Sequence, residues 1–350
     1  MFLNKLPFVI FLLMVPILTL QGLGCSKSSP TSPTSGVWLE TTAHAPWAPR
    51  YGIGGTVFNG SMYVIGGASG SGSVTNYYGD VYSSSDGINW KQNVSSAPFG
   101  ARYSPGVVSF IGKLWVIGGN EGGTFKNDVW NSSDGTTWNQ VTTATPIFTP
   151  REDFIAIALN GFMYVISGWS AGTANNDIWA TADGVNWSQV APAVSPLATN
   201  PSGFSRRWGA AGTIFNSLIW IYGGANGLPT STTLGGLNDE WTFDGTNLVQ
   251  INDTGLSTNG YDLVYAQLTG VNTNLWLTPG SAPAYPPITG YLTSSDGINW
   301  GSHPSYYPAR DGHLALSYNN QLWVMGGFDT QCWTTTSCAV TYYNDVWHSP

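Results

Sequence analysis

Short apolar runs alternate with polar turns along this chain, and the whole pattern returns six times at intervals of roughly fifty residues. The clearest repeat has an apolar run that ends in two glycines (114–119), then an Asn-Asp-Val-Trp segment (127–130), then an Asp-Gly pair followed by Trp138. Runs this short, with no sustained 3.6-residue apolar period, predict β-strands rather than helices. A recurring unit of this length is typical of a β-propeller blade. Matching apolar runs begin at Met62, Met163, Ile219, Leu275 and Leu322.

Within each repeat the pattern predicts four antiparallel strands, named a to d in chain order. In the second repeat they cover residues 104–110, 113–117, 128–133 and 136–141. Asn-Gly and Asp-Gly pairs fall between strands a and b and between strands c and d, where tight hairpin turns require positive φ. Strand b is apolar throughout, as expected when neighbouring sheets cover both of its faces. Four strand-c tryptophans are expected to fill the layers between blades: Trp130, Trp179, Trp241 and Trp347.

The two ends of the repeat region predict how the ring closes. The last repeat reaches strand c at 344–347 and lacks an outer strand. Trp38 precedes Arg50 by the same twelve residues that separate Trp90 from Arg102, so the N-terminal strand has the spacing of a strand d. We expect it to complete the sixth blade and remove an open sheet edge. The predicted fold is therefore all-β: a six-bladed propeller over residues 36–350, with four antiparallel strands in each blade.

The repeat also resembles a known family. Its paired glycines, the aromatic residue of strand b and the later tryptophan are similar to those of kelch-repeat propellers, and the similarity extends over residues 36–350. The fifth repeat departs from the pattern, with Thr-Pro-Gly at 278–280 in place of the glycine pair. The resemblance implies a kelch-type propeller, in which arginines at the channel rim bind ligands in some members.

Residues 1–24 have the features of an export signal. Lys5 is followed by an apolar run over 6–20, which is short for a membrane-spanning helix. Residues 22–25 (Gly-Leu-Gly-Cys) resemble a bacterial lipobox, which implies a lipidated Cys25; ordinary secretion is the alternative. Residues 25–35, rich in Ser, Pro and Thr, predict a flexible tether. We therefore expect an exported, membrane-anchored lipoprotein of the bacterial envelope or cell surface.

Composition excludes some classes of function. The net charge of -8 and the pI near 4.7 disfavour nucleic acid as a partner, because binding phosphates requires a basic surface. Cys332 and Cys338 are spaced to close a small disulfide ring, which fits an oxidising compartment. The four histidines show no metal-ligand spacing, and no glycine-rich loop opens a helix. We predict no metal and no cofactor.

Repeated arginines supply the most specific polar pattern. Each lies twelve residues before the first apolar residue of strand b, and they are Arg50, Arg102, Arg151, Arg207 and Arg310. Because strand a is innermost, we expect them around the channel mouth, where they would bind a carboxylate-bearing ligand. The alternative is that they pair with the aspartates that begin strand c and so tie the blades together. The fifth repeat, with Leu263 at the arginine position, lacks both residues, which favours pairing. Those aspartates are Asp80, Asp128, Asp177, Asp239 and Asp345.

A weaker pattern concerns catalysis and stacking. Glu152, Asp153 and Asp311 are the acids nearest the rim, and with His313 they form a candidate set for acid–base work on a sugar; solvated surface charges are the alternative. Loop aromatics are candidates for stacking on a sugar or a peptide, or for packing the loops: Tyr78, Trp169 and Trp333.

These patterns together predict a non-enzymatic, surface-tethered propeller. It would bind a protein or a glycan, with anionic ligands among the candidates, on the face formed by the b–c and d–a loops. The alternative function is an extracytoplasmic carbohydrate-active enzyme of the sialic-acid isomerase or glycosidase type.

Overall fold

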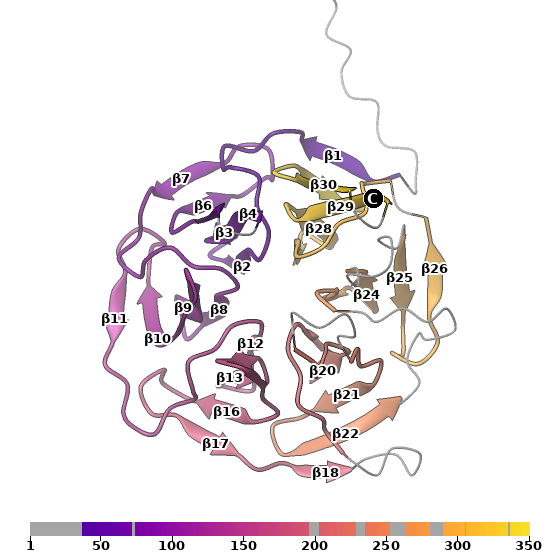
Figure 1. Ribbon diagram of the computed structural model, residues 1–350. Helices are drawn as coiled ribbons and strands as arrows, with labels where there is room; N and C mark the ends of the chain where they lie inside the picture. Colours follow the sequence, from indigo (N-terminus) through magenta and orange to yellow (C-terminus); the bar gives the residue numbers. More distant parts are fainter. Residues whose placement is uncertain are drawn as a thin grey trace, which may run out of the picture. The chain divides into compact units, whose positions relative to one another are not determined.

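Six antiparallel sheets surround a central channel and make up a six-bladed β-propeller, as the repeat predicted (Figure 1). The computed structural model describes residues 37–71, 74–195, 203–228, 235–252, 264–280, 290–304, 306–334 and 337–350. Strands and turns account for these residues, and no helix is found among them that is long and apolar enough to cross a membrane.

Each blade orders its four strands from the channel outward. The first has β2 (Gly54–Phe58), β3 (Ser61–Ile65), β6 (Val81–Ser84) and β7 (Lys91–Val94). The second has β8 (Gly106–Phe110), β9 (Lys113–Glu121), β10 (Thr124–Ser132) and β11 (Asn139–Val141). The third has β12 (Ile155–Leu159), β13 (Phe162–Ile166), β16 (Ile178–Thr181) and β17 (Ser188–Val190).

The remaining blades follow the same order. The fourth has β19 (Ala211–Phe215), β20 (Leu218–Tyr222), β21 (Glu240–Phe243) and β22 (Asn247–Asn252), and β18 (Ala193–Ser195) pairs in parallel with β22. The fifth has β23 (Gln267–Val271), β24 (Asn274–Thr278), β25 (Tyr291–Ser294) and β26 (Gly301–His303). The sixth has β27 (Leu314–Tyr318), β28 (Gln321–Met325), β31 (Val346–His348) and β1 (Leu39–Thr42).

The N-terminal strand closes the ring, as predicted. β1 runs antiparallel to β31, with Leu39 opposite His348 and Glu40 opposite Trp347. Just before β1, Trp38 is only 2% exposed and packs edge-on against Tyr307, with ring centroids 4.8 Å apart. Closure therefore combines strand pairing with burial of a large aromatic side chain, and it covers the outer edge of β31.

Apolar layers between neighbouring blades form the core. Between the third and fourth blades, for example, Ile166 and Ile178 pack with Ile221 and Trp241. The strand-c tryptophans lie in such layers, which confirms the role predicted for them. Three of the b–c connections, which the repeat pattern predicts only as loops, pair their backbones into two-stranded hairpins. These are β4–β5 (Ala68–Ser71 with Val74–Tyr77), β14–β15 (Trp169–Ser170 with Thr173–Ala174) and β29–β30 (Phe328–Thr334 with Ser337–Tyr342).

The Asp-Gly turns of the first five blades each contact the preceding blade. Thr181 Oγ1 accepts a hydrogen bond from Gly184 N at 2.8 Å, and Asp183 Oδ1 accepts from the two following backbone N–H groups. Gly184 has φ of +78°, and a Cβ there would lie 2.3 Å from the Trp115 ring of the preceding blade. Glycine is therefore needed both for the turn and for this contact.

Candidate functional site

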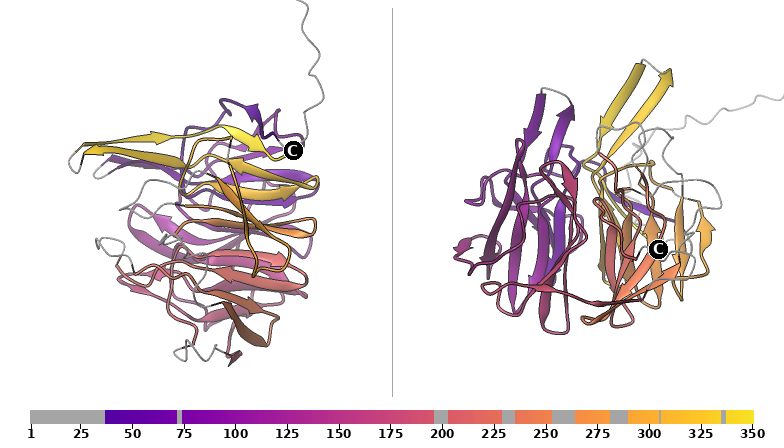
Figure 2. Two further views of the ribbon diagram at one scale, coloured as in Figure 1. Left: turned by 90° about the vertical axis from the view of Figure 1, so that its right-hand side faces the viewer. Right: turned by 60° about the horizontal axis from the view of Figure 1, so that its bottom comes forward.

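The b–c hairpins that the structure describes lie on one face of the ring, and the β29–β30 hairpin projects beyond the blades there (Figure 2). Cys332 and Cys338 are directly opposite each other in this hairpin. Their side chains, like that of Trp333 and the whole of Cys25, lie outside the described residues. The predicted disulfide and lipidation stay predictions.

The five repeated arginines are buried and ion-paired within their own blades. Arg207 donates to both carboxylate oxygens of Asp239 at 2.8 Å and to Gly223 O at 3.0 Å. Each arginine side chain is at most 1% exposed. The five pairs are Arg50–Asp80, Arg102–Asp128, Arg151–Asp177, Arg207–Asp239 and Arg310–Asp345.

These pairs also connect adjacent blades, because the backbone of the arginine is hydrogen-bonded to the preceding blade. Arg102 N donates to Tyr78 O, and Arg102 O accepts from Gly67 N, both at 2.9 Å and both in the first blade. Its side chain reaches Asp128 and Gly118 O in the second blade. The pairing interpretation of the arginine pattern is confirmed.

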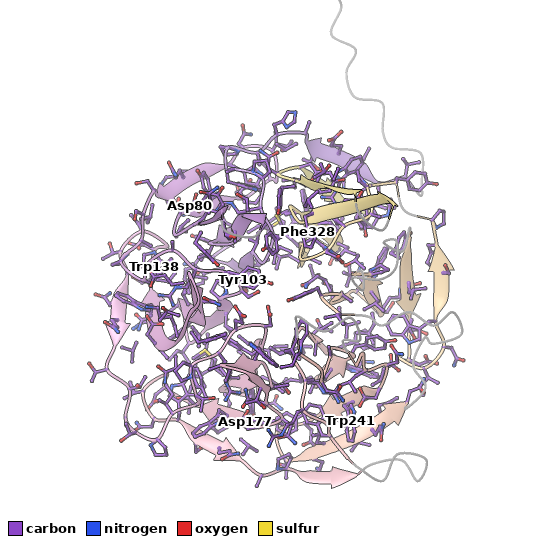
Figure 3. The ribbon with its side chains drawn as sticks, viewed as in Figure 1. Asp80, Tyr103, Trp138, Asp177, Trp241 and Phe328 are labelled. Carbon is purple, nitrogen blue, oxygen red and sulfur yellow. The ribbon has the colours of Figure 1, made fainter. Side chains whose placement is uncertain are left out.

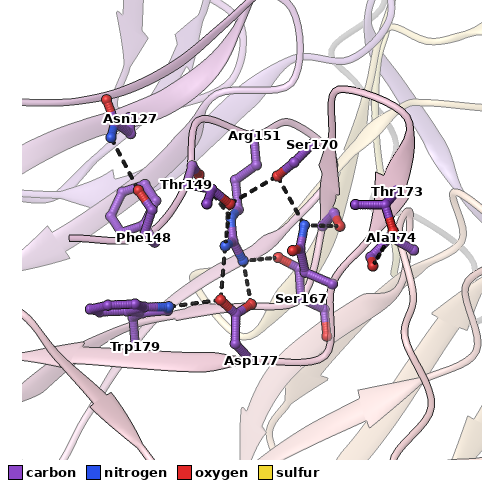
Figure 4. A network of polar contacts seen from close by, with 12 residues as sticks. Asn127, Phe148, Thr149, Arg151, Ser167, Ser170, Thr173, Ala174, Asp177 and Trp179 are labelled. Carbon is purple, nitrogen blue, oxygen red and sulfur yellow. Dashed lines mark hydrogen bonds and ion pairs between the residues drawn. The ribbon is translucent and has the colours of Figure 1, made fainter. Parts of the chain in front are cut away.

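Figure 4 shows the third of these networks. Arg151 donates to Thr149 O at 3.0 Å and to Ser167 O at 2.7 Å, besides Asp177. Trp179 Nε1 donates to the same carboxylate at 2.8 Å. Burial acts to raise the pKa of Asp177, but the hydrogen bonds and the charge of Arg151 outweigh it, so the pKa is lowered.

The expectation of exposed guanidinium groups around the channel mouth is therefore corrected. The physical reason is that a buried charge needs a partner, and the strand-c aspartate is the partner within reach. The predicted ligand contacts of these arginines are disfavoured, since their charged groups are enclosed and already hydrogen-bonded.

Two predicted aromatic contacts pack the loops. The Arg50 guanidinium lies 3.8 Å from the centroid of the Tyr78 ring, and Tyr78 hydrogen-bonds Ser69. Trp169 is 8% exposed and lies edge-on to Trp208, with centroids 6.2 Å apart. Of the two interpretations of these aromatics, the geometry favours packing for Tyr78 and Trp169.

A different ring of residues lines the channel mouth. Two positions after each arginine, or after Leu263 in the fifth repeat, the backbone is left-handed in every blade, with φ between 46° and 61°. Backbone hydrogen bonds connect these positions from blade to blade; Gly52 N donates to Gly312 O and Ser104 N donates to Gly52 O, both at 2.9 Å. The six positions are Gly52, Ser104, Asp153, Gly209, Tyr265 and Gly312.

Three of these positions carry a residue with a side chain, although glycine would adopt the left-handed backbone without strain. A left-handed backbone costs a residue with a Cβ roughly 1–2 kcal/mol. Here the three side chains converge: Tyr265 donates to Asp153 at 3.2 Å, and Ser104 hydrogen-bonds the same carboxylate. Strain retained where side chains meet in a channel is a mark of a functional site.

A pocket of about 340 Å³ opens next to this ring, on the face of the b–c loops. The channel continues as a cavity of about 450 Å³ between the innermost strands. Figure 3 shows Tyr103 and Phe328 at the inner edge of the ring, whereas Asp80 and Asp177 lie farther out within their blades. The pocket is lined by Tyr51, Tyr77, Tyr103, Asn120, Glu152, Tyr265, Gly312 and Phe328. Unlike the arginines, its aromatic side chains are only partly buried.

Two neighbouring carboxyl groups lie at the mouth, and burial favours the protonated form of each. Burial and the neighbouring Asp153 raise the pKa of Glu152 to about 8. Burial raises the pKa of Asp153 to about 6, against hydrogen bonds from Ser104, Tyr265 and Tyr103. Glu152 Oε2 is buried and has no hydrogen-bond partner. None of the described residues that line the pocket or the channel is basic, so these acids have no counter-charge there.

The other predicted acid–base residues lie elsewhere. Asp311 and His313 are buried, 6% and 2% exposed, and neither lines the pocket. His313 Nε2 is 2.7 Å from Thr278 Oγ1, and burial lowers the pKa of His313 to about 3. His313 is therefore neutral near pH 7. The structure thus places Glu152 and Asp153 at the mouth and separates His313 from them.

Several pocket residues were not predicted: Tyr51, Tyr103, Asn120 and Tyr265. A usable signal was present, because Tyr51, Tyr103 and Glu152 each directly follow a repeated arginine. When the repeats are aligned on the arginine, the residue types at the next two positions vary from blade to blade. Among the described residues, no group of three or more His, Cys, Asp and Glu side chains is arranged to hold a metal ion.

Neither models of known protein families nor curated proteins match this chain.

Proposed function

We propose that this protein is an exported lipoprotein of the kelch type that binds a glycan in the pocket at its channel mouth. The lipobox-like residues before Cys25 support the anchor, and the paired glycines with the later tryptophan support the kelch relationship. The observation that carries the binding function is the pocket itself, with partly buried aromatics around Glu152, whose Oε2 has no hydrogen-bond partner.

The shape and lining of the pocket favour a sugar over a protein surface. Its volume of about 340 Å³ lies at the low end of small-ligand sites, which span about 300–1,000 Å³. A stable protein interface needs about 800 Å² from each partner, far more than a narrow pocket offers. Tyrosine rings provide flat apolar faces with hydroxyl groups at their edges, and Glu152 and Asn120 add polar groups that fix orientation.

The charge of the mouth favours a neutral or cationic ligand. Anionic ligands were candidates because the arginines were expected at the channel mouth. The structure encloses these arginines in ion pairs instead. Glu152 and Asp153 would repel a carboxylate or a sulfate. An acidic sugar such as sialic acid is therefore a poor candidate.

A glycan and peptide array tests this function. The wild-type protein is expected to retain glycans, and Tyr103→Ala is expected to weaken retention at least tenfold. Tyr306→Ala is the matched control, because Tyr306 is 51% exposed and does not line the pocket. Retention of peptides alone, or equal retention by both variants, would refute glycan binding in this pocket.

One observation favours the enzymatic alternative: Glu152 and Asp153 have raised pKa values, as general acids often do. However, glycosidase carboxyls flank the scissile bond from two sides, about 5–10 Å apart. These two are neighbours in one blade, so binding ranks first. Incubating a retained glycan with the protein and with Glu152→Gln, then analysing the products, separates the two functions.

A further inference from the structure

The lining of the mouth pocket selects for charge as well as for shape. We infer that the glycan bound there carries a protonated amino group, as in an amino sugar that lacks its N-acetyl group. This inference rests on the proposed glycan binding and specifies the chemical class of the ligand. Three features of the pocket lead to it.

The first feature is the unsatisfied carboxyl. Glu152 Oε2 is buried without a hydrogen-bond partner, and Asp153 is the next residue of the same chain segment. A buried carboxylate without a partner is unfavourable, and an ammonium group supplies both hydrogen-bond donors and the opposite charge. A sugar hydroxyl can also donate a hydrogen bond, but it carries no positive charge. Hydrogen bonds in which one group is ionised are roughly twice as strong as those between neutral groups, and an ammonium group adds the attraction of opposite charges.

The second feature is the absence of any built-in cation. No described residue lining the pocket is basic, and the nearby arginines are held by the strand-c aspartates. Lys126, in β10 of the second blade, does not line the pocket, and its ammonium group pairs with Glu121 at 2.7 Å. A positive charge beside the Glu152 carboxyl would therefore come from a bound ligand.

The third feature is the aromatic wall beside the acids. The Tyr51 ring lies 4.9 Å from Phe328, 5.2 Å from Tyr103 and 5.8 Å from Tyr342, centroid to centroid. Partly buried aromatic rings attract an ammonium group through their negative faces. Burial, nearby tyrosines and the two carboxyls raise the pKa of Tyr51 to about 12, so these hydroxyls stay neutral and add no charge of their own.

Ammonium binding should also release protons. Glu152 and Asp153 have raised pKa values in the free protein, and a nearby cation favours their charged forms. The other titratable groups facing them have pKa values raised further and do not ionise near pH 7: Tyr51, Tyr103 and Tyr265. Near pH 7 the carboxyls are therefore the source of released protons.

Isothermal titration calorimetry near pH 7 tests the inference with two probes: glucosamine oligomers and N-acetylglucosamine oligomers of the same length. The wild-type protein should bind the free-amine oligomer at least tenfold more tightly. Titrations in two buffers of different ionisation enthalpy should show proton release with that oligomer alone. Glu152→Gln should remove the preference. Glu121→Gln, which removes a charge on the same face outside the pocket, should keep it.

The outcomes separate the two proposals. Equal affinity for both oligomers, or a preference that survives in Glu152→Gln, would overturn the amino-group inference and leave glycan binding standing. Absence of binding to every glycan would overturn both. Because the comparison of the two oligomers uses the wild-type protein, the test does not depend on how the variants fold.

Discussion

Replacing Arg207 with alanine tests whether the buried ion pairs stabilise the propeller. The substitution leaves Asp239, whose side chain is 7% exposed, without its bidentate partner. It also removes the hydrogen bonds to Gly223 O and Ser205 O. Breaking a buried pair by removing one partner costs about 3–5 kcal/mol, and we expect a loss of that size in the free energy of unfolding.

The neighbouring residue provides a control. Arg206 is exposed, and its side chain makes one hydrogen bond, to Thr173 Oγ1 at 3.2 Å. Arg206→Ala should change the free energy of unfolding by no more than about 0.5 kcal/mol. Equilibrium urea unfolding followed by tryptophan fluorescence measures both variants. Arg207→Met combined with Asp239→Asn should recover much of the loss, because no unpaired charge remains while Trp241 Nε1 keeps an acceptor.

An equal loss of stability in Arg207→Ala and Arg206→Ala would show that the buried ion pair does not stabilise the propeller. The same holds if the double variant were as unstable as Arg207→Ala, because the penalty would then not come from the uncompensated carboxylate.

Two further predictions concern packing and pH. Gly184→Ala should lower the free energy of unfolding by about 2–5 kcal/mol, because the new Cβ clashes with Trp115 and the left-handed backbone is strained. Gly161→Ala, at φ of +80° with nothing within 4 Å of the new Cβ, should lower it by about 1–2 kcal/mol. Equal losses for the two variants in urea unfolding would contradict the contact between blades. Burial raises the pKa of Glu240 from about 4.5 to about 8, so the folded protein holds more protons than the unfolded chain between these values, and stability falls as pH rises through that range. Glu240→Gln should reduce that fall by on the order of 4 kcal/mol at pH 8 and leave the share that comes from Glu152 and Asp153. An equal fall in stability from pH 5 to 8 in the wild type and in the variant, measured by thermal unfolding, would refute this prediction.

The sequence located the candidate site only in part. Glu152 and Asp153 were candidates because they follow a repeated arginine. The sequence could not show that Tyr51 and Tyr265 complete their pocket, because these residues belong to blades on different parts of the ring. Nor could it show that the guanidinium of Arg151 is enclosed, since burial depends on how the adjacent blade packs.

The sequence by itself determined the blades, their number and the closure by β1. Those features depend on local chemistry that repeats: Asp-Gly turns, apolar strand-b runs and strand-c tryptophans, each read within one repeat of roughly fifty residues. Tertiary structure alone decided which charges are exposed. Closing the ring buried Arg207 against Asp239 and left Glu152 Oε2 at the mouth without a hydrogen-bond partner, because a buried group pairs with a complementary charge within reach and no basic residue is among the described residues that line the mouth.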